Sequence, residues 1–206
     1  MKKLTSNYPI MLRLEGKKVV VVGGGKVAER KVAGLLGTGA TIEVISPKLT
    51  DELEKLAQDG QILWLQKSFS TEDIDQALMI FAVTNDSNIN QLIKKAASAH
   101  QLITIADDPD NSDYHVPAQV KRGRLTIAVS TGGASPILAG TITKQLAHEF
   151  DEQYEEYVEF LYWARRKILN EATDPIKKKQ LLTTIVSPEF LNSDHREADF
   201  VSLFPS

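Results

Sequence analysis

The stretch "KKVVVVGGGKVAERKVAGLL", residues Lys17–Leu36, decides the fold. Its run Val19–Val22 is short, apolar and β-branched, which is typical of a strand buried in a parallel sheet. From Lys26 to Leu36 the apolar residues recur at helical spacing. The pattern predicts a strand, a glycine turn and a helix in immediate succession.

The glycine turn fits the pattern G-x-G-x-x-A at Gly23, Gly25 and Ala28. Gly23 permits a tight turn, Gly25 lets backbone N–H groups approach a pyrophosphate, and Ala28 lets the helix lie close to the strand. In this strand–turn–helix setting the pattern indicates dinucleotide binding. The alternative is a glycine turn that serves packing alone.

Strands and helices alternate through the next 75 residues, which predicts an α/β fold with a Rossmann-like, doubly wound parallel sheet. Ligands bind such sheets outside the carboxyl ends of the strands. Loops 23–26, 46–48 and 84–86 are expected to meet there, with loop 107–110 nearby. The expected strands are 41–45, 62–65, 78–83 and 102–106, and the expected helices are 50–58, with Thr50 as N-cap, and 89–100.

The pattern changes after residue 112. Two strands joined by Lys121–Arg124 form an expected hairpin, and a helix is expected to begin at Pro136 with Ser135 as its N-cap. Helical sequence continues to about residue 186 with a break at "TDPI", and Leu161, Ala164, Ile168 and Leu169 are expected to share one face.

Composition limits the classes of function. The 206 residues are 42% hydrophobic and 25% charged, with a net charge of -3, so no dominant basic field favours nucleic acid. There is no cysteine, which excludes disulfides and thiolate metal sites. Neither a secretion signal nor a membrane-spanning run is expected, and a cytoplasmic protein is the default expectation.

The second expected strand ends in Ser46-Pro47-Lys48, where an acidic residue often binds the ribose. The Ser46 hydroxyl could bond a ribose hydroxyl. NADP also remains a possible cofactor, because the positive charge of Lys48 suits a phosphate. An ordinary strand-end loop explains the same residues equally well.

Asp107 and Asp108 follow the last strand of the expected sheet, where a carboxylate can act as a general base. Their surroundings, "DDPDNSD", also favour a plain solvated turn. His115 could shuttle a proton, but a lone histidine in a strand is more often simply hydrogen-bonded. The other histidines show no metal-ligand spacing, so no metal site is predicted.

A second glycine-rich element, "STGGASP" at 130–136, joins a strand to a helix. Its N–H groups and hydroxyls suit a carboxylate or phosphate, and the alternative is a capping loop. The basic residues Lys121, Arg122 and Arg124 are either a solvated hairpin tip or partners of substrate carboxylates.

Together these segments resemble the precorrin-2 dehydrogenase / sirohydrochlorin ferrochelatase family of sirohaem biosynthesis. The resemblance rests on "YPIMLRLEGKKVVVVGGGKVAERK", "VISP", "FAVTND", "ADDP" and "VSTGGASPILA", covers about residues 8 to 150 well, and matches the stand-alone form without a fused methyltransferase domain. It implies three parts: an NAD-binding Rossmann domain 1–112, a small α+β dimerisation segment 113–148 that exchanges strands across a homodimer, and a C-terminal helical domain 149–206. It also implies NAD-dependent oxidation of precorrin-2 to sirohydrochlorin.

The resemblance also implies roles for individual residues. Asp107 matches the catalytic aspartate, which takes a proton as hydride leaves the macrocycle and would suit that role if burial raised its pKa. Thr131 matches a serine that is phosphorylated in some members. The implied cofactor contacts are Lys26, Val27, Pro47, Lys48, Thr84 and Asn85, beside Gly23, Gly25 and Ser46, and the expected contacts of the eight substrate carboxylates are Thr131, Gly132, Gly133, Ser135, His115 and Arg13.

Two alternatives stay open at this point. Some family members also insert Fe²⁺ into sirohydrochlorin, and the family has no spaced metal-ligand motif that would reveal this. From another class, a Rossmann regulatory module that senses NAD(H) would need the glycine turn but neither Asp107 nor the "STGGASP" loop.

Overall fold

A computed structural model describes residues 7–204. The described chain forms two compact units. One unit is residues 8–116, and the other is made chiefly of residues 117–204.

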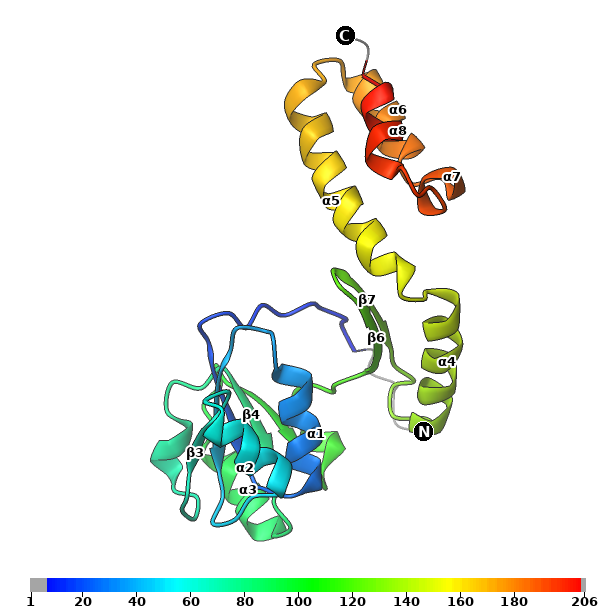
Figure 1. Cartoon of the computed structure of the whole chain (residues 1–206). Coiled ribbons are helices and arrows are strands. Elements are labelled where there is room, and N and C mark those ends of the chain that lie inside the picture. The colour runs from blue at the N-terminus through cyan, green and yellow to red at the C-terminus, as the bar shows by residue number, and fades with distance from the viewer. Residues whose placement is uncertain (1–6, 205–206) are drawn as a thin grey trace. The chain divides into compact units, whose positions relative to one another are not determined.

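The unit of residues 8–116 is built on a parallel five-stranded sheet (Figure 1). Its strand order is β3-β2-β1-β4-β5, in which the chain moves outward from β1 in one direction and then resumes on the other side at β4. This confirms the predicted doubly wound sheet. The strands are β1 (Lys18–Val22), β2 (Thr41–Ile45), β3 (Leu63–Leu65), β4 (Met79–Ala82) and β5 (Leu102–Ile105).

Alternate residues of β1 serve two separate cores, because successive side chains of a strand point to opposite faces. Val19 and Val21 pack with α1 (Lys26–Leu35) and α2 (Asp51–Gln58). Val20 and Val22 pack with α3 (Ser87–Ala96) and with the 3₁₀ turn η1 (Thr71–Ile74). β1 is therefore covered on both faces, which explains its unbroken run of valines.

Helix α3 differs from the prediction at both ends. It begins at Ser87, two residues earlier than expected, because the Asp86 side chain accepts hydrogen bonds from the backbone N–H groups of Asn88 and Ile89. It ends at Ala96 and not at His100, since Ala97 has extended dihedral angles. A second 3₁₀ turn, η2 (Pro109–Asn111), follows β5.

The second unit begins with an antiparallel hairpin of β6 (Ala118–Arg122) and β7 (Leu125–Val129). Gly123 makes the turn with a φ of 52°, as expected from the sequence. Helix α4 (Pro136–Glu149) follows, and the Ser135 hydroxyl accepts a hydrogen bond from the Leu138 N–H at 3.1 Å. The predicted N-cap and first-turn proline are confirmed.

The remaining helices form their own core (Figure 1). The predicted break at "TDPI" is confirmed, and a further break at residues 150–152, between α4 and α5, was not predicted. Ala164 and Ile168 are buried, but Leu169 is 43% exposed, because it lies about 100° around the helix from Ile168 and outside the buried stripe. The helices are α5 (Gln153–Glu171), α6 (Pro175–Thr184), α7 (Pro188–Leu191) and α8 (Arg196–Ser202).

Across residues 7–204, none of the helices combines the length and the apolar character needed to cross a membrane.

Candidate functional site

A cleft of about 620 Å³ opens at the carboxyl ends of β1, β2 and β4. This is the position that the doubly wound topology predicts for a ligand. The structure brings together there most of the residues expected to contact a cofactor. They are Gly23, Gly25, Ser46, Pro47, Lys48, Thr84 and Asn85.

The three glycines of the turn have different tasks. Gly23 has a φ of 124°, and a Cβ on it would lie 2.6 Å from the Val83 carbonyl oxygen. A Cβ on Gly24 would lie 2.0 Å from the Lys48 carbonyl oxygen, a close approach that the motif pattern did not single out. A Cβ on Gly25 would meet no protein atom within 4 Å. Gly23 and Gly24 are thus required by the fold itself, while the space beside Gly25 is open.

Helix α1 begins at this turn without a side-chain cap, since its N-cap residue is Gly25. The neighbouring helices are capped, α2 by the Thr50 hydroxyl and α3 by the Asp86 carboxylate. The first N–H groups of a helix need acceptors and carry its positive dipole end. An uncapped helix end and open space at Gly25 fit the pyrophosphate of a dinucleotide.

The strand end at Ser46 is shaped by its own hydrogen bonds. The Ser46 hydroxyl donates to the Lys48 carbonyl oxygen at 2.7 Å, and the Trp64 indole N–H donates to the Ser46 carbonyl oxygen at 2.9 Å. Ser46 is buried, whereas Pro47 and Lys48 are exposed beside the cleft. These bonds fix the backbone of residues 46–48 on one side of the cleft, and Lys48 is the charged residue of this loop.

Two of the expected cofactor contacts, Lys26 and Val27, do not line the cleft. Lys26 is exposed and forms an ion pair with Glu29 at 2.9 Å, which raises the pKa of the lysine. Val27 packs against the core on the α1 side of the sheet. Both follow the glycine turn on α1.

Asp107 is exposed and both of its carboxylate oxygens accept hydrogen bonds. The Ser87 hydroxyl donates to Oδ2 at 2.5 Å, and the Asn90 amide donates to Oδ1 at 2.8 Å. These bonds, first that of Ser87 and then that of Asn90, lower the pKa of Asp107. The idea that burial raises this pKa is wrong, because the side chain is not buried and two donors stabilise its charged form.

Ser87 and Asn90 were missed by the sequence analysis. Asn90 is fully buried on α3, and it also binds Thr84, a residue of the cleft lining. One signal was present in the sequence: Asn90 precedes the buried Ile93 by three residues and so lies on the inward face of an amphipathic helix. A polar side chain at such a position needs hydrogen-bond partners.

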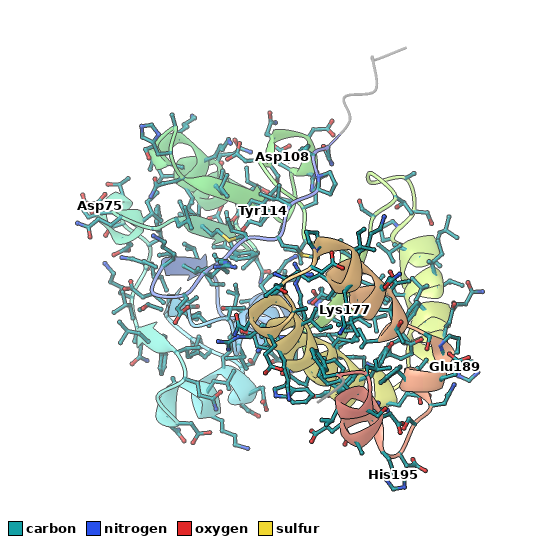
Figure 2. The ribbon with its side chains drawn as sticks, turned by 90° about the horizontal axis from the view of Figure 1, so that it is seen from above. Asp75, Asp108, Tyr114, Lys177, Glu189 and His195 are labelled. Carbon is teal, nitrogen blue, oxygen red and sulfur yellow. The ribbon has the colours of Figure 1, made fainter. Side chains whose placement is uncertain are left out.

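Asp108 has a structural task, in agreement with the turn alternative. Its carboxylate accepts hydrogen bonds from Asn111 and Gln91, and it caps the 3₁₀ turn η2 on the loop after β5 (Figure 2). His115 is exposed and precedes β6, so it does not lie in a strand as expected. Arg13 is exposed in the segment before β1.

The second glycine-rich loop, in the other unit, makes most of its bonds with itself. The Thr131 hydroxyl accepts from the Ser135 N–H and donates to the Ser135 carbonyl oxygen, both at 3.0 Å. The Gly132 N–H donates to the Ser130 hydroxyl, and the Ala134 N–H donates to the Thr131 carbonyl oxygen. Gly132 and Gly133 are exposed, with φ of 59° and 86°. The hydroxyls form a capping loop, while the glycine backbone stays accessible.

The basic hairpin tip is partly engaged within its own unit. Arg124 pairs with Glu159 at 2.8 Å, and its guanidinium lies 3.7 Å from the ring centroid of Tyr162. Arg122 donates to the carbonyl oxygen of Ala147 at 3.2 Å, near the end of α4. Lys121 is exposed. Two of the three basic residues thus have structural partners.

Within residues 7–204, no group of three or more histidine and acidic side chains is arranged to hold a metal ion.

The first unit is a Rossmann-type nucleotide-binding domain. Its glycine turn lies where the strand order reverses and leads into a helix without a side-chain cap. Comparison with protein families agrees: residues 10–118 match an NAD(P)-binding family. Residues 122–148 match the central part of sirohaem biosynthesis proteins, and residues 154–199 match the SirC C-terminal domain. The chain belongs to the precorrin-2 dehydrogenase family, which confirms the resemblance found in its motifs.

The relatives support this over nearly the full length. A precorrin-2 dehydrogenase of Priestia megaterium is 35% identical, over 94% of this chain and 96% of that protein. A solved structure of SirC, precorrin-2 dehydrogenase, has 35% identity and a TM-score of 0.82 over 95% of this chain and 98% of the other. A siroheme synthase of Nitrosococcus oceani is 38% identical, but this chain spans only 36% of its length.

Proposed function

We propose that this protein oxidises precorrin-2 to sirohydrochlorin with NAD⁺ as the hydride acceptor. The observation that carries the proposal is the cleft itself, where an uncapped glycine turn and the Thr84–Asn85 loop meet. Asp107 is joined to that loop through one buried amide, Asn90. The relatives named precorrin-2 dehydrogenase give the substrate class.

In this proposal different residues of the cleft contact different parts of the dinucleotide. Gly25 and the first N–H groups of α1 hold the pyrophosphate, and Ser46, Pro47 and Lys48 border the ribose. Lys26 and Val27 are the first residues of α1, so in this proposal they contact the cofactor through their backbone N–H groups and not through side chains in the cleft lining. Thr84 and Asn85 border the nicotinamide, which supplies the hydride-accepting carbon when bound.

Asp107 accepts the proton that the macrocycle loses together with the hydride. Removal of one hydride and one proton balances the two-electron oxidation, with NAD⁺ reduced to NADH. Two hydrogen bonds keep Asp107 ionised near neutral pH, and its exposure lets it pass the proton on to solvent. The lowered pKa makes Asp107 a weak base, so it holds the proton only briefly before solvent takes it.

The choice of NAD over NADP belongs to this proposal. Lys48 is the exposed cation beside the ribose end of the cleft, and its charge would tolerate a 2′-phosphate. The cofactor assay must therefore include NADP⁺.

The second unit supplies the proposed substrate contacts and the proposed dimer interface. The exposed backbone of Gly132 and Gly133, with Thr131 and Ser135, would face substrate carboxylates, and His115 and Arg13 are further contacts proposed from the first unit. Apolar residues of α4 support a homodimer, since Ile137 is 83% exposed and Leu138 is 51% exposed. We also propose that the chain is divided into three functional parts, at residues 112 and 148. A location in the cytoplasm is a further part of the proposal.

An anaerobic assay of the purified protein with precorrin-2 tests the proposal. NAD⁺ or NADP⁺ is added, and the sirohydrochlorin spectrum is followed with and without Fe²⁺ or Co²⁺. We expect oxidation that depends on NAD⁺, and Asp107→Ala should keep cofactor binding and lose turnover. Metal insertion faster than in a protein-free control would add chelatase activity.

Two results would contradict the proposal. Absence of oxidation with either cofactor would remove the dehydrogenase activity. A wild type that binds NAD⁺ but does not oxidise precorrin-2 would favour a module that senses NAD(H), and unchanged turnover in Asp107→Ala would remove Asp107 from the reaction.

A further inference from the structure

Asn90 is the one fully buried polar side chain of helix α3, within the part of the chain that the structure describes. Its Oδ1 accepts hydrogen bonds from the backbone N–H and the hydroxyl of Thr84, at 3.2 and 2.8 Å. Its Nδ2 donates to the Thr84 carbonyl oxygen at 3.2 Å and to Asp107 Oδ1 at 2.8 Å. Every donor and acceptor of the amide is used.

These partners determine how the amide is oriented. A backbone N–H can only donate, so it faces Oδ1, and an ionised carboxylate can only accept, so it faces Nδ2. Asn90 therefore connects two loops with defined polarity: the loop after β4, which lines the cleft, and the loop after β5, which carries Asp107. A shift of either loop would break bonds inside a buried network, where unpaired groups are costly.

We infer that Asn90 is a positioning residue that holds the Asp107 carboxylate, which does not itself line the cleft, at a fixed place relative to the Thr84–Asn85 loop, with Ser87 as the second donor. The inference rests on the proposed function, because it assigns to Asp107 the role of proton acceptor. Asn90 itself has no exposed surface. Its effect on the reaction passes through Asp107.

The charged groups around Asp107 do not replace these donors. On α3, Asp86 caps the helix, and Lys94 pairs with Asp113. On the η2 side, Asp108 is held by Asn111 and Gln91 and is a like charge. Two neutral donors, Ser87 and Asn90, are what stabilise the ionised carboxylate.

The test replaces each donor and compares it with a matched control. Asn90→Asp keeps the shape of the side chain but turns its donor into a second acceptor, and Asn88→Asp makes the same change at an exposed position of the same helix. Ser87→Ala removes the second donor from an exposed position, with Ser98→Ala as its control. Ser87→Ala keeps the inference testable if Asn90→Asp fails to fold.

We expect Asn90→Asp to lower kcat by about 100-fold, because displacement of a catalytic group by about 1 Å has effects of that order. The Kd of NAD⁺ should rise much less than kcat falls, because the variant loses the bond to the Thr84 carbonyl oxygen but leaves the glycine turn and the Ser46–Lys48 loop unchanged. In Ser87→Ala the acid limb of the kcat–pH profile should move to higher pH by about one unit, as a donor to the charged form is lost. Both controls should match the wild type.

Carboxyl NMR of the protein without substrate gives an independent readout, in which the pKa of Asp107 should rise in Ser87→Ala. An active wild type whose variants keep kcat and the pH profile would overturn this inference alone. A fall in kcat explained wholly by weaker NAD⁺ binding would also overturn it. An inactive wild type would overturn the proposed function and this inference with it.

Discussion

The chain contains two glycine-rich turns that each lead into a helix, and they treat the helix end in opposite ways. At Gly23–Gly25 the turn leaves the start of α1 without a cap and with open space beside it. At Ser130–Pro136 the loop caps α4 with Ser135 and bonds Thr131 back to the same residue. Glycines before a helix therefore do not by themselves make an anion site. What matters is whether the loop already satisfies the N–H groups.

The largest effect is expected from Gly24→Ala. The added Cβ would lie 2.0 Å from the Lys48 carbonyl oxygen, so the backbone of one of the two loops must move. We expect destabilisation by about 3 kcal/mol, as for other overpacked sites, together with loss of cofactor binding. Thermal and urea unfolding measure the first and isothermal titration the second. A variant as stable as the wild type would show that the two loops are not in contact.

Gly25→Ala is the matched substitution that separates the fold from the ligand. Its Cβ meets no protein atom within 4 Å, so stability should change by less than about 1 kcal/mol. The methyl group enters the space assigned to the pyrophosphate, so the Kd of NAD⁺ should rise at least about tenfold, which is about 1.4 kcal/mol. Unchanged affinity in a folded variant would move the pyrophosphate away from this turn.

The same approach applies to the second loop through Thr131→Val, which keeps the shape of the side chain and removes both of its bonds to Ser135. We expect a loss of about 1 kcal/mol in stability and a higher KM for precorrin-2, with the Kd of NAD⁺ unchanged. Thr131→Ser is the control, because it keeps the hydroxyl. If both variants kept the wild-type KM, the loop would be a cap without a part in substrate binding.

The smallest expected effect is a difference in acid sensitivity between the segment 67–73, which contributes to the cleft lining, and the loop Ser130–Pro136. Asp73 forms an ion pair with Lys67, a residue of the cleft lining, and accepts a hydrogen bond from the Ser70 N–H at 2.8 Å. Burial alone would raise the pKa of Asp73, but these partners outweigh it and the pKa is lowered. A lowered pKa in the folded state gives stability that is present above the unfolded value and is lost as pH falls through the folded value.

The segment 67–73 should therefore lose stability below about pH 4. The loop Ser130–Pro136 contains no ionisable side chain and should not respond. Hydrogen exchange of residues 67–73 and 130–136 between pH 3 and 6 measures both. Asp73→Asn should reduce the pH dependence at residues 67–73 and leave the part due to Glu72, whose pKa is lowered by hydrogen bonds, first that of its own backbone N–H. Equal acid sensitivity of both segments would contradict this account.

The sequence by itself determined the sheet, the glycine turn and the starts of α1, α2 and α4. Val19–Val22 had to be buried on both faces, and a parallel sheet covered by helices does this. Caps such as Thr50 and Ser135 act within three residues, so their local pattern is enough to predict them. The cleft residues followed as well, because the carboxyl ends of parallel strands meet at one edge.

Tertiary structure alone decided the features that depend on distant segments. The need for glycine at position 24 comes from a carbonyl 24 residues away, at Lys48. The low pKa of Asp107 comes from Ser87 and Asn90, which lie on another element. Because these donors are distant in the chain, the residues around Asp107 indicated only a solvated turn, and the family resemblance suggested a buried base. Hydrogen bonds and steric contacts act over a few ångströms, and only the fold brings residues far apart in the chain to that distance.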